Sequence, residues 1–148
     1  MNRPEGFHAV TPRLIVKNAR EAIDLYKNLF GAKEIYSLNC PESGKIAQAQ
    51  LRIDDSPLLI ADENPAHGNV LSMGQQFFLY TDNVEDMHRK ALELGFTEKD
   101  PVQETYRGDI SCRVVDPFGN SWILAKQLRE VSVSDMEEAL KERKSKAA

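Results

Sequence analysis

The sequence predicts an α+β fold made of two tandem βαβββ modules that form a cupped mixed sheet, followed by a short C-terminal helix. Two repeated landmarks support this prediction. Two amphipathic helical segments end at Gly31 and Gly95, and the apolar runs Leu58–Ala61 and Trp122–Ala125 follow the same order; both pairs are separated by 64 residues. A repeat of this length is typical of paired modules rather than of a solenoid.

The modules are expected at about residues 10–64 and 75–127, which make residues 1–130 one region of paired modules. Residues 131–148 are expected to form a helical extension. A duplicated sheet would create a concave seam, so a ligand site would be shared between the halves. The polar linker Asn64–Gly74 is long enough for the modules to pair within one chain or to swap between two.

The first module reads as strand, helix, strand, strand, strand. Arg13–Val16 is a short apolar run, and Asn18 can cap a helix whose apolar residues recur at helical spacing until Gly31. The segment 47–53 alternates strictly between small or apolar and polar side chains, which is typical of a strand with one packed face. The remaining strands are expected at Ile35–Leu38, Ala47–Ile53 and Leu58–Ala61.

The second module repeats this order. Asp82 or Asn83 is expected to cap its helix, which Gly95 ends. Its strands are expected at Phe77–Thr81, Thr97–Lys99, Ile110–Val115 and Trp122–Ala125. The pattern Ser134-Asp135-Met136-Glu137 resembles a capping box and predicts that a C-terminal helix begins at Ser134.

The composition excludes several partners. The chain of 148 residues has a formal net charge of −4 and dispersed basic residues, which argues against nucleic acid as a partner. It contains no apolar run near the ~20 residues that span a bilayer, and its first residues lack the apolar core of a signal peptide, so we expect a cytoplasmic protein without membrane contact. Cys40 and Cys112 are too few for a disulfide framework and are interpreted as packing thiols.

The sequence contains the helix exit Tyr26-x-x-x-Phe30-Gly31 and the turn Asp116-Pro-Phe-Gly-Asn-x-Trp122. These two motifs resemble those of the vicinal oxygen chelate superfamily, which includes glyoxalases, bleomycin-binding proteins and dioxygenases. The PhnB-like branch is similar in further segments, namely Leu14–Lys17, Gly44–Ile46, Asp62-Glu63 and Gly108-Asp109. The resemblance implies the glyoxalase/bleomycin-resistance fold. It also implies a homodimer with clefts at the subunit interface, which the exposed sheet edges favour.

The resemblance also implies where a metal ion would bind. Metal enzymes of this superfamily hold a divalent cation with His, Glu or Gln side chains at four slots, which fall here on Thr11, Leu59 or Ile60, Gln76, and Ile123. Of these only Gln76 is a good oxygen donor, and apolar side chains cannot replace the hydration of an ion. The PhnB-like branch usually has His where Gln48 stands. We therefore expect no metal and no cofactor in the cup.

The three histidines do not change this expectation. His8, His67 and His88 match no metal-binding spacing, and each is interpreted as exposed or as lying on a helix face. The sequence also lacks a nucleophile elbow and a phosphate-binding glycine loop.

A metal-free cup with polar and aromatic lining remains. Strand alternation predicts that its ligand-facing residues are Arg13, Gln48, Gln50, Gln76, Phe78, Tyr80 and Arg113. Trp122 has the opposite parity from Ile123 and is assigned to packing against a helix. Aromatic rings supply stacking area and amides fix orientation, which suits a planar or polar small organic molecule.

The sequence favours a metal-independent small-molecule-binding protein that sequesters an antibiotic-like or polar aromatic compound. The alternative is a glyoxalase-like or dioxygenase-like enzyme, either a lyase, an isomerase or an oxygenase, with an atypical or absent metal site. A metal-free enzyme would use Arg113, Asp109 or Tyr106. A scaffold without a ligand would be favoured if side chains filled the cup. The sequence identifies neither the ligand nor any catalysis.

Overall fold

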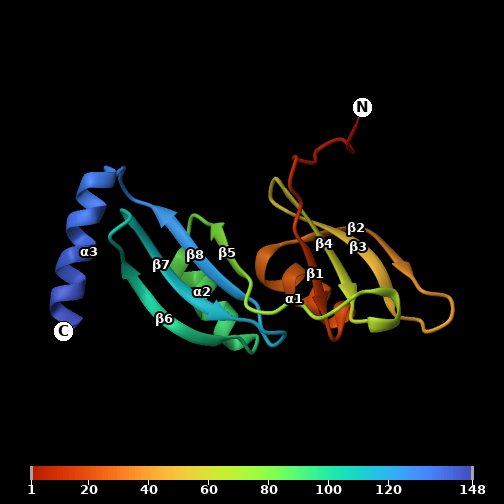
Figure 1. Ribbon diagram of the computed structural model, residues 1–148. Coiled ribbons are helices and arrows are strands. Elements are labelled where there is room, and N and C mark those ends of the chain that lie inside the picture. The colour runs from red at the N-terminus through yellow and green to blue at the C-terminus, as the bar shows by residue number, and fades with distance from the viewer. Residues whose placement is uncertain (1, 148) are drawn as a thin grey trace. The chain divides into compact units, whose positions relative to one another are not determined.

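The computed structural model describes residues 2–147 and confirms the α+β fold (Figure 1). The chain divides into two compact units, one ending at Gly74 and the other beginning at Gln75. Each unit holds one four-stranded mixed sheet and one helix packed against it. The strand orders are β1-β4-β3-β2 and β5-β8-β7-β6, so the two units repeat the same topology.

The predicted order of elements is confirmed in both units. The first unit contains β1 (Arg13–Val16), α1 (Ala19–Phe30), β2 (Lys33–Asn39), β3 (Ile46–Ile53), β4 (Ser56–Asp62) and the 3-10 helix η1 (Pro65–His67). The second contains β5 (Gln76–Tyr80), α2 (Val84–Glu93), β6 (Thr97–Glu104), β7 (Asp109–Val115), β8 (Ser121–Gln127) and α3 (Val133–Ala147). Among the described residues, no helix is long and apolar enough to cross a membrane.

Helix α1 has both ends where the sequence places them. The Asn18 side chain accepts a hydrogen bond from the backbone N–H of Glu21, and Gly31 ends the helix with a φ of 65°. Ala22, Ile23 and Tyr26 are fully buried, because they recur at helical spacing on the face turned to the sheet. This face and the β-strand residues beneath it form the core of the first unit.

An ion-pair cluster fixes the exposed side of α1 to β2. The Arg20 guanidinium donates to both carboxylate oxygens of Glu34 over 2.9 and 3.0 Å, and Lys27 Nζ lies 2.7 Å from Oε1 of Glu34. The hydrogen bonds from Arg20 and then Lys27 lower the pKa of Glu34 to about 2. The carboxylate is therefore more acidic in the folded protein than in the unfolded chain.

Replacing Glu34 with Gln is expected to remove about 1 kcal/mol of stability at neutral pH. The full pKa shift would correspond to more, but Arg20 and Lys27 are 47% and 40% exposed and solvent screens the pairs. Because the folded-state pKa is depressed, this stability is present above about pH 4.5 and is lost as the pH falls toward 2. Urea unfolding followed by circular dichroism between pH 2 and 7 measures it.

The wild-type protein and the Glu34→Gln variant should therefore converge at the acid end of this range. Glu5→Gln, which makes the same change at an exposed glutamate outside this cluster, serves as the matched control. A constant difference between wild type and Glu34→Gln across the range would contradict the ion-pair explanation.

The second unit builds its core in the same way. Asn83 caps α2, its side chain accepting from the N–H of Asp86 over 3.0 Å. Trp122 is 3% exposed and lies 4.9 Å from the Phe77 ring, between centroids, on the face that α2 covers. Cys112 is buried on this face, and burial raises the pKa of its thiol to about 11, so it is a packing residue.

Two element boundaries differ from the sequence prediction. Strand β6 continues past Lys99 to Glu104 although it contains Pro101, because an edge strand with register shifts tolerates a residue that cannot donate to the ladder. The capping box at Ser134 is wrong: Ser132 caps α3, its hydroxyl accepting from the N–H of Asp135. The pattern Ser132-x-x-Asp135 meets the same requirement two residues earlier.

The segment between β8 and α3 is fastened to the turn before β7. The Gly108 carbonyl accepts the backbone N–H groups of Leu128 and Arg129 over 2.9 and 3.1 Å. Gly108 has a φ of 88°, and a Cβ built there would lie 2.5 Å from the carbonyl oxygen of Arg129. Only glycine fits this close approach. Beyond it, the Arg143 guanidinium of α3 stacks 5.4 Å from the Tyr106 ring centroid.

Candidate functional site

The face of the first sheet opposite α1 carries a linked set of polar side chains. Nε of Arg13 donates to Oε1 of Gln48 over 3.1 Å, and Nε2 of Gln48 donates to the hydroxyl of Tyr36 over 3.0 Å. The register places Gln50 beside Tyr36 on β2 and beside Leu59 on β4, which in turn pairs with Arg13. The three residues predicted from this unit, Arg13, Gln48 and Gln50, therefore share one face. These contacts hold the Gln48 amide and the Arg13 guanidinium in defined orientations.

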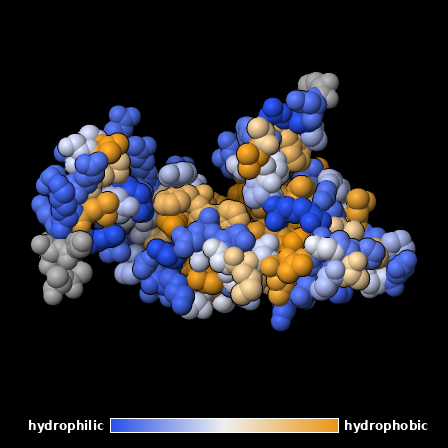
Figure 2. All heavy atoms as spheres, in the orientation of Figure 1, coloured by the Kyte–Doolittle hydropathy of each residue, from blue (hydrophilic) through white to orange (hydrophobic). Residues whose placement is uncertain are grey.

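The corresponding face of the second sheet carries two exposed aromatic rings. Phe78 and Tyr80 are 46% and 69% exposed, and their rings stack with centroids 6.2 Å apart. Gln76 is an exposed residue on the same strand and the same face. The register joins Phe78 through Ile123 to Arg113, whose Nε lies 3.0 Å from a carboxylate oxygen of Asp100. The four residues predicted from this unit thus also share a face. Hydrophobic areas are visible among hydrophilic ones on the molecular surface in Figure 2.

Arg107 is the site residue that sequence reasoning missed. Its guanidinium lies 5.1 Å from the Phe78 ring centroid and 5.3 Å from that of Tyr106. Its Nε donates to Oδ2 of Asp109 over 3.1 Å, and its terminal nitrogen donates to the hydroxyl of Ser111 over 3.2 Å. Arg107 stands in a turn, where no strand or helix period marks a side chain as facing the sheet.

The electrostatics around Arg107 favour a fixed positive charge. Burial is the largest single influence and opposes that charge, but the hydrogen bonds and charge attraction from Asp109 and Tyr106 together outweigh it, and the pKa of Arg107 is raised. Asp109 is only 6% exposed, and it also accepts a hydrogen bond of 2.6 Å from the Thr105 hydroxyl. A carboxylate held by these donors suits a positioning role better than that of a general base.

The metal slots implied by the superfamily do not fit a metal ion. Leu59, Ile60 and Ile123 have no donor atoms in their side chains, and Ile60 and Ile123 are buried at 0% and 8% exposure. Thr11 and Gln76 supply oxygen donors from two different units. A divalent cation needs several strong donors in one cavity, so no metal chemistry is derived from these positions.

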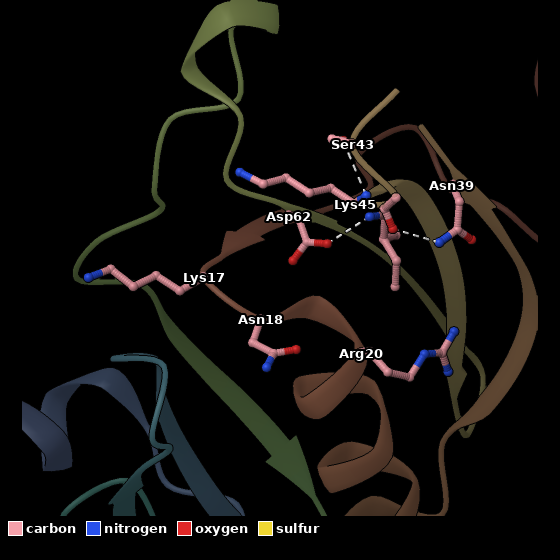
Figure 3. Close-up of a pocket in the computed structure, with 9 residues that line it drawn as sticks. Lys17, Asn18, Arg20, Asn39, Ser43, Lys45 and Asp62 are labelled. Carbon is pink, nitrogen blue, oxygen red and sulfur yellow. Dashed lines mark hydrogen bonds between the residues drawn. The ribbon is translucent and has the colours of Figure 1, made fainter. Parts of the chain in front are cut away.

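A separate cavity of about 420 Å³ opens where α1 begins (Figure 3). It is lined by residues from the β1–α1 connection, α1, β2, the β2–β3 turn, β3 and β4, namely Lys17, Asn18, Arg20, Asn39, Ser43, Gly44, Lys45, Ile46 and Asp62. Asp62 forms part of its wall, with Oδ1 accepting from the N–H of Ala19 and Oδ2 from that of Ile46, both over 2.7 Å. None of the ligand-facing residues predicted from the sequence lines this cavity.

The chain resembles proteins of one superfamily. The model of the Glyoxalase/Bleomycin resistance protein/Dioxygenase superfamily matches residues 6–124. An uncharacterized protein of Mycobacterium bovis is 30% identical over 140 residues, which cover 89% of this chain and 91% of that protein. The PhnB protein structure from Bacillus cereus has a TM-score of 0.63 at 16% identity, covering 80% of this chain and 99% of that one. The fosfomycin resistance protein FosX from Listeria monocytogenes has a TM-score of 0.62 at 18% identity, covering 87% and 97%. These two structures share the fold.

Proposed function

Because this chain belongs to the Glyoxalase/Bleomycin resistance protein/Dioxygenase superfamily, we propose that it binds a small, planar, polar organic molecule without a metal ion. The observation that supports this most strongly is the pair of exposed, stacked rings of Phe78 and Tyr80 beside the Arg107 guanidinium. An aromatic ligand can stack on such rings, and a fixed cation attracts a carboxylate or carbonyl group. The ligand is accordingly an aromatic compound that carries an anionic or strongly polar group.

The remaining ligand-facing residues would orient the molecule. Gln76 and Arg113 flank the two rings on the second sheet, and Arg13, Gln48 and Gln50 form the polar face of the first sheet. The proposed protein is a homodimer, in which these polar faces contact the ligand. Amides there would supply donors and acceptors without adding net charge. Light scattering of the purified cytoplasmic protein would test the homodimer.

The proposed role is sequestration. The superfamily is named partly for bleomycin resistance, and FosX is described as a fosfomycin resistance protein, which supports an antibiotic-like ligand for this chain as well. The poor donor set at the superfamily's metal slots supports binding without conversion. The enzyme alternative, a lyase, isomerase or oxygenase, requires turnover of the bound molecule by Arg113, Asp109 or Tyr106.

Binding is tested by isothermal titration with bleomycin and with a panel of aromatic carboxylates in the presence of EDTA. We expect at least one probe to bind, and we expect Phe78→Ala and Tyr80→Ala each to weaken it about tenfold, since a stacked ring contributes roughly 1–1.5 kcal/mol. Leu92→Ala, which truncates an exposed apolar side chain on α2, should bind as the wild type does.

The outcomes separate the two functions. Recovery of the bound probe with unchanged mass supports sequestration, whereas a product whose formation Asp109→Asn abolishes supports the enzyme. Binding that requires a metal ion, or that is equally strong in Phe78→Ala and wild type, would overturn the proposed site.

A further inference from the structure

Three side chains of types that can bind a metal ion meet in the first unit, and none of them is one of the predicted ligand-facing residues. Cys40 and Glu42 belong to the turn between β2 and β3, and His67 ends η1, which follows β4. The thiol sulfur, a carboxylate oxygen and a ring nitrogen of these residues all lie within 4.8 Å of one another. Cys40 is half-buried, whereas Glu42 and His67 are exposed.

Hydrogen bonds of the protein itself hold the two contributing segments in place. In the turn, the N–H of Cys40 donates to the carbonyl of Lys45 over 2.7 Å, and the N–H of Gly44 donates to the carbonyl of Cys40 over 2.8 Å. Lys45 Nζ then donates to the carbonyl of Glu63 over 3.0 Å, which ties the turn to the end of β4. The site would therefore be largely formed before an ion arrives.

The segment that carries His67 is closed in the same way. Asn64 and Asn69 form a two-residue bridge, each donating its N–H to the carbonyl of the other, and the N–H of His67 donates to the carbonyl of Asn64 over 2.9 Å. These bonds place the imidazole opposite the turn without using its ring nitrogens. The side chain remains able to rotate toward a ligand, because His67 is exposed.

We propose that Cys40, Glu42 and His67 bind a transition-metal ion, with Zn²⁺ preferred. Thiolate, imidazole and carboxylate are the ligands of tetrahedral zinc, and three protein ligands leave a fourth position for water. If the three donor atoms were all 4.8 Å apart, the point equidistant from them would lie roughly 2.8 Å from each. Zinc–ligand bonds are shorter, about 2.0–2.3 Å. Small rotations of two exposed side chains close this difference. Mg²⁺ and Ca²⁺ are excluded, because both require oxygen ligands.

This site goes beyond the proposed ligand binding and uses none of its residues. The turn that carries Cys40 and Glu42 also supplies Ser43, Gly44 and Lys45 to the wall of the cavity at the start of α1. An ion that joins this turn to η1 would fix one wall of that cavity and stabilise the first unit. Binding to the folded state alone raises the free energy of unfolding by mass action.

The test is a titration of the reduced full-length protein with Co²⁺, which reports thiolate coordination through a sulfur-to-metal charge-transfer band. We expect the band to saturate at one equivalent, to disappear when Zn²⁺ is added and to persist in excess Mg²⁺. Cys40→Ser should abolish the band, and Glu42→Gln and His67→Gln should each weaken binding at least about tenfold. His8→Gln, a change of an exposed histidine outside the cluster, and Cys112→Ala should keep it.

Each outcome decides the proposal. A wild-type protein without the band, or a band that survives Cys40→Ser, would overturn it. Circular dichroism of the apo variants shows that a lost band reflects a lost ligand rather than unfolding. Since the ligand-facing rings lie in the other unit, Cys40→Ser should leave probe binding at Phe78 and Tyr80 unchanged, and failure of one proposal would not imply failure of the other.

Discussion

Replacing Asp116 with Asn is expected to lower the free energy of unfolding of the second unit by about 3 kcal/mol. Asp116 is 4% exposed, and Oδ1 accepts the backbone N–H groups of Phe118 and Asn120 over 2.9 and 3.0 Å. Oδ2 accepts the indole N–H of Trp122 over 2.9 Å. An asparagine side chain has one carbonyl oxygen and one NH₂ group. Its NH₂ group would therefore face at least one of these N–H groups, and two buried donors would lie against each other.

Urea unfolding measures this effect with a built-in probe, because Trp122 is the one tryptophan of the chain and reports on the second unit. Asp82→Asn makes the same chemical change at an exposed position in the same unit and should alter stability by less than about 0.5 kcal/mol. Equal losses in the two variants would show that the turn does not depend on the Asp116 carboxylate.

Replacing Asp62 with Ala is expected to cost the first unit about 2–3 kcal/mol. One oxygen of this carboxylate accepts the first N–H of α1, at Ala19. The other accepts the N–H of Ile46 where β3 begins, and Figure 3 shows this second bond. A negative charge at a helix N-terminus adds a favourable interaction with the helix dipole. The substitution removes both bonds and this charge together, and it leaves the N–H groups without their acceptor.

Hydrogen exchange is the appropriate measurement, because the tryptophan lies in the other unit. The amides of Ala19 and Ile46 should lose protection in Asp62→Ala before the remainder of the sheet does. Glu63→Gln is the matched control, since the structure uses the backbone carbonyl of Glu63 and not its side chain to bind Lys45. Unchanged protection at both amides would contradict the bridging role of Asp62.

Much of the fold could be predicted because its signals are local. Strand β1 and the end of α1 at Gly31 have the predicted bounds, since an apolar run, an Asn cap and a glycine act on neighbouring residues. The resemblance to the superfamily is confirmed. The length of β6 was not predictable, because pairing with β7 rather than its own polar sequence keeps it extended past Pro101.

In the candidate site, too, the residues with a local sequence signal could be predicted and the others could not. Alternation placed Gln76, Phe78 and Tyr80 on one face, and the register agrees, because the period of a strand is visible in sequence. Arg107 stands in a turn, and Cys40 and His67 come from two segments that are distant in the sequence. Neither has a periodic signal. The sequence alone predicts only an exposed histidine at His67, since its partners lie in another segment of the sequence.

Gly108 has a consequence for the end of the chain. Because its carbonyl accepts two successive N–H groups and a Cβ at this position would lie 2.5 Å from the carbonyl oxygen of Arg129, the direction in which the chain leaves β8 is set before α3 begins. A methyl group on Gly108 would push the backbone at Arg129 away and would displace α3. The orientation of a tag or fusion partner attached after α3 would therefore depend on Gly108, a residue of the turn between β6 and β7.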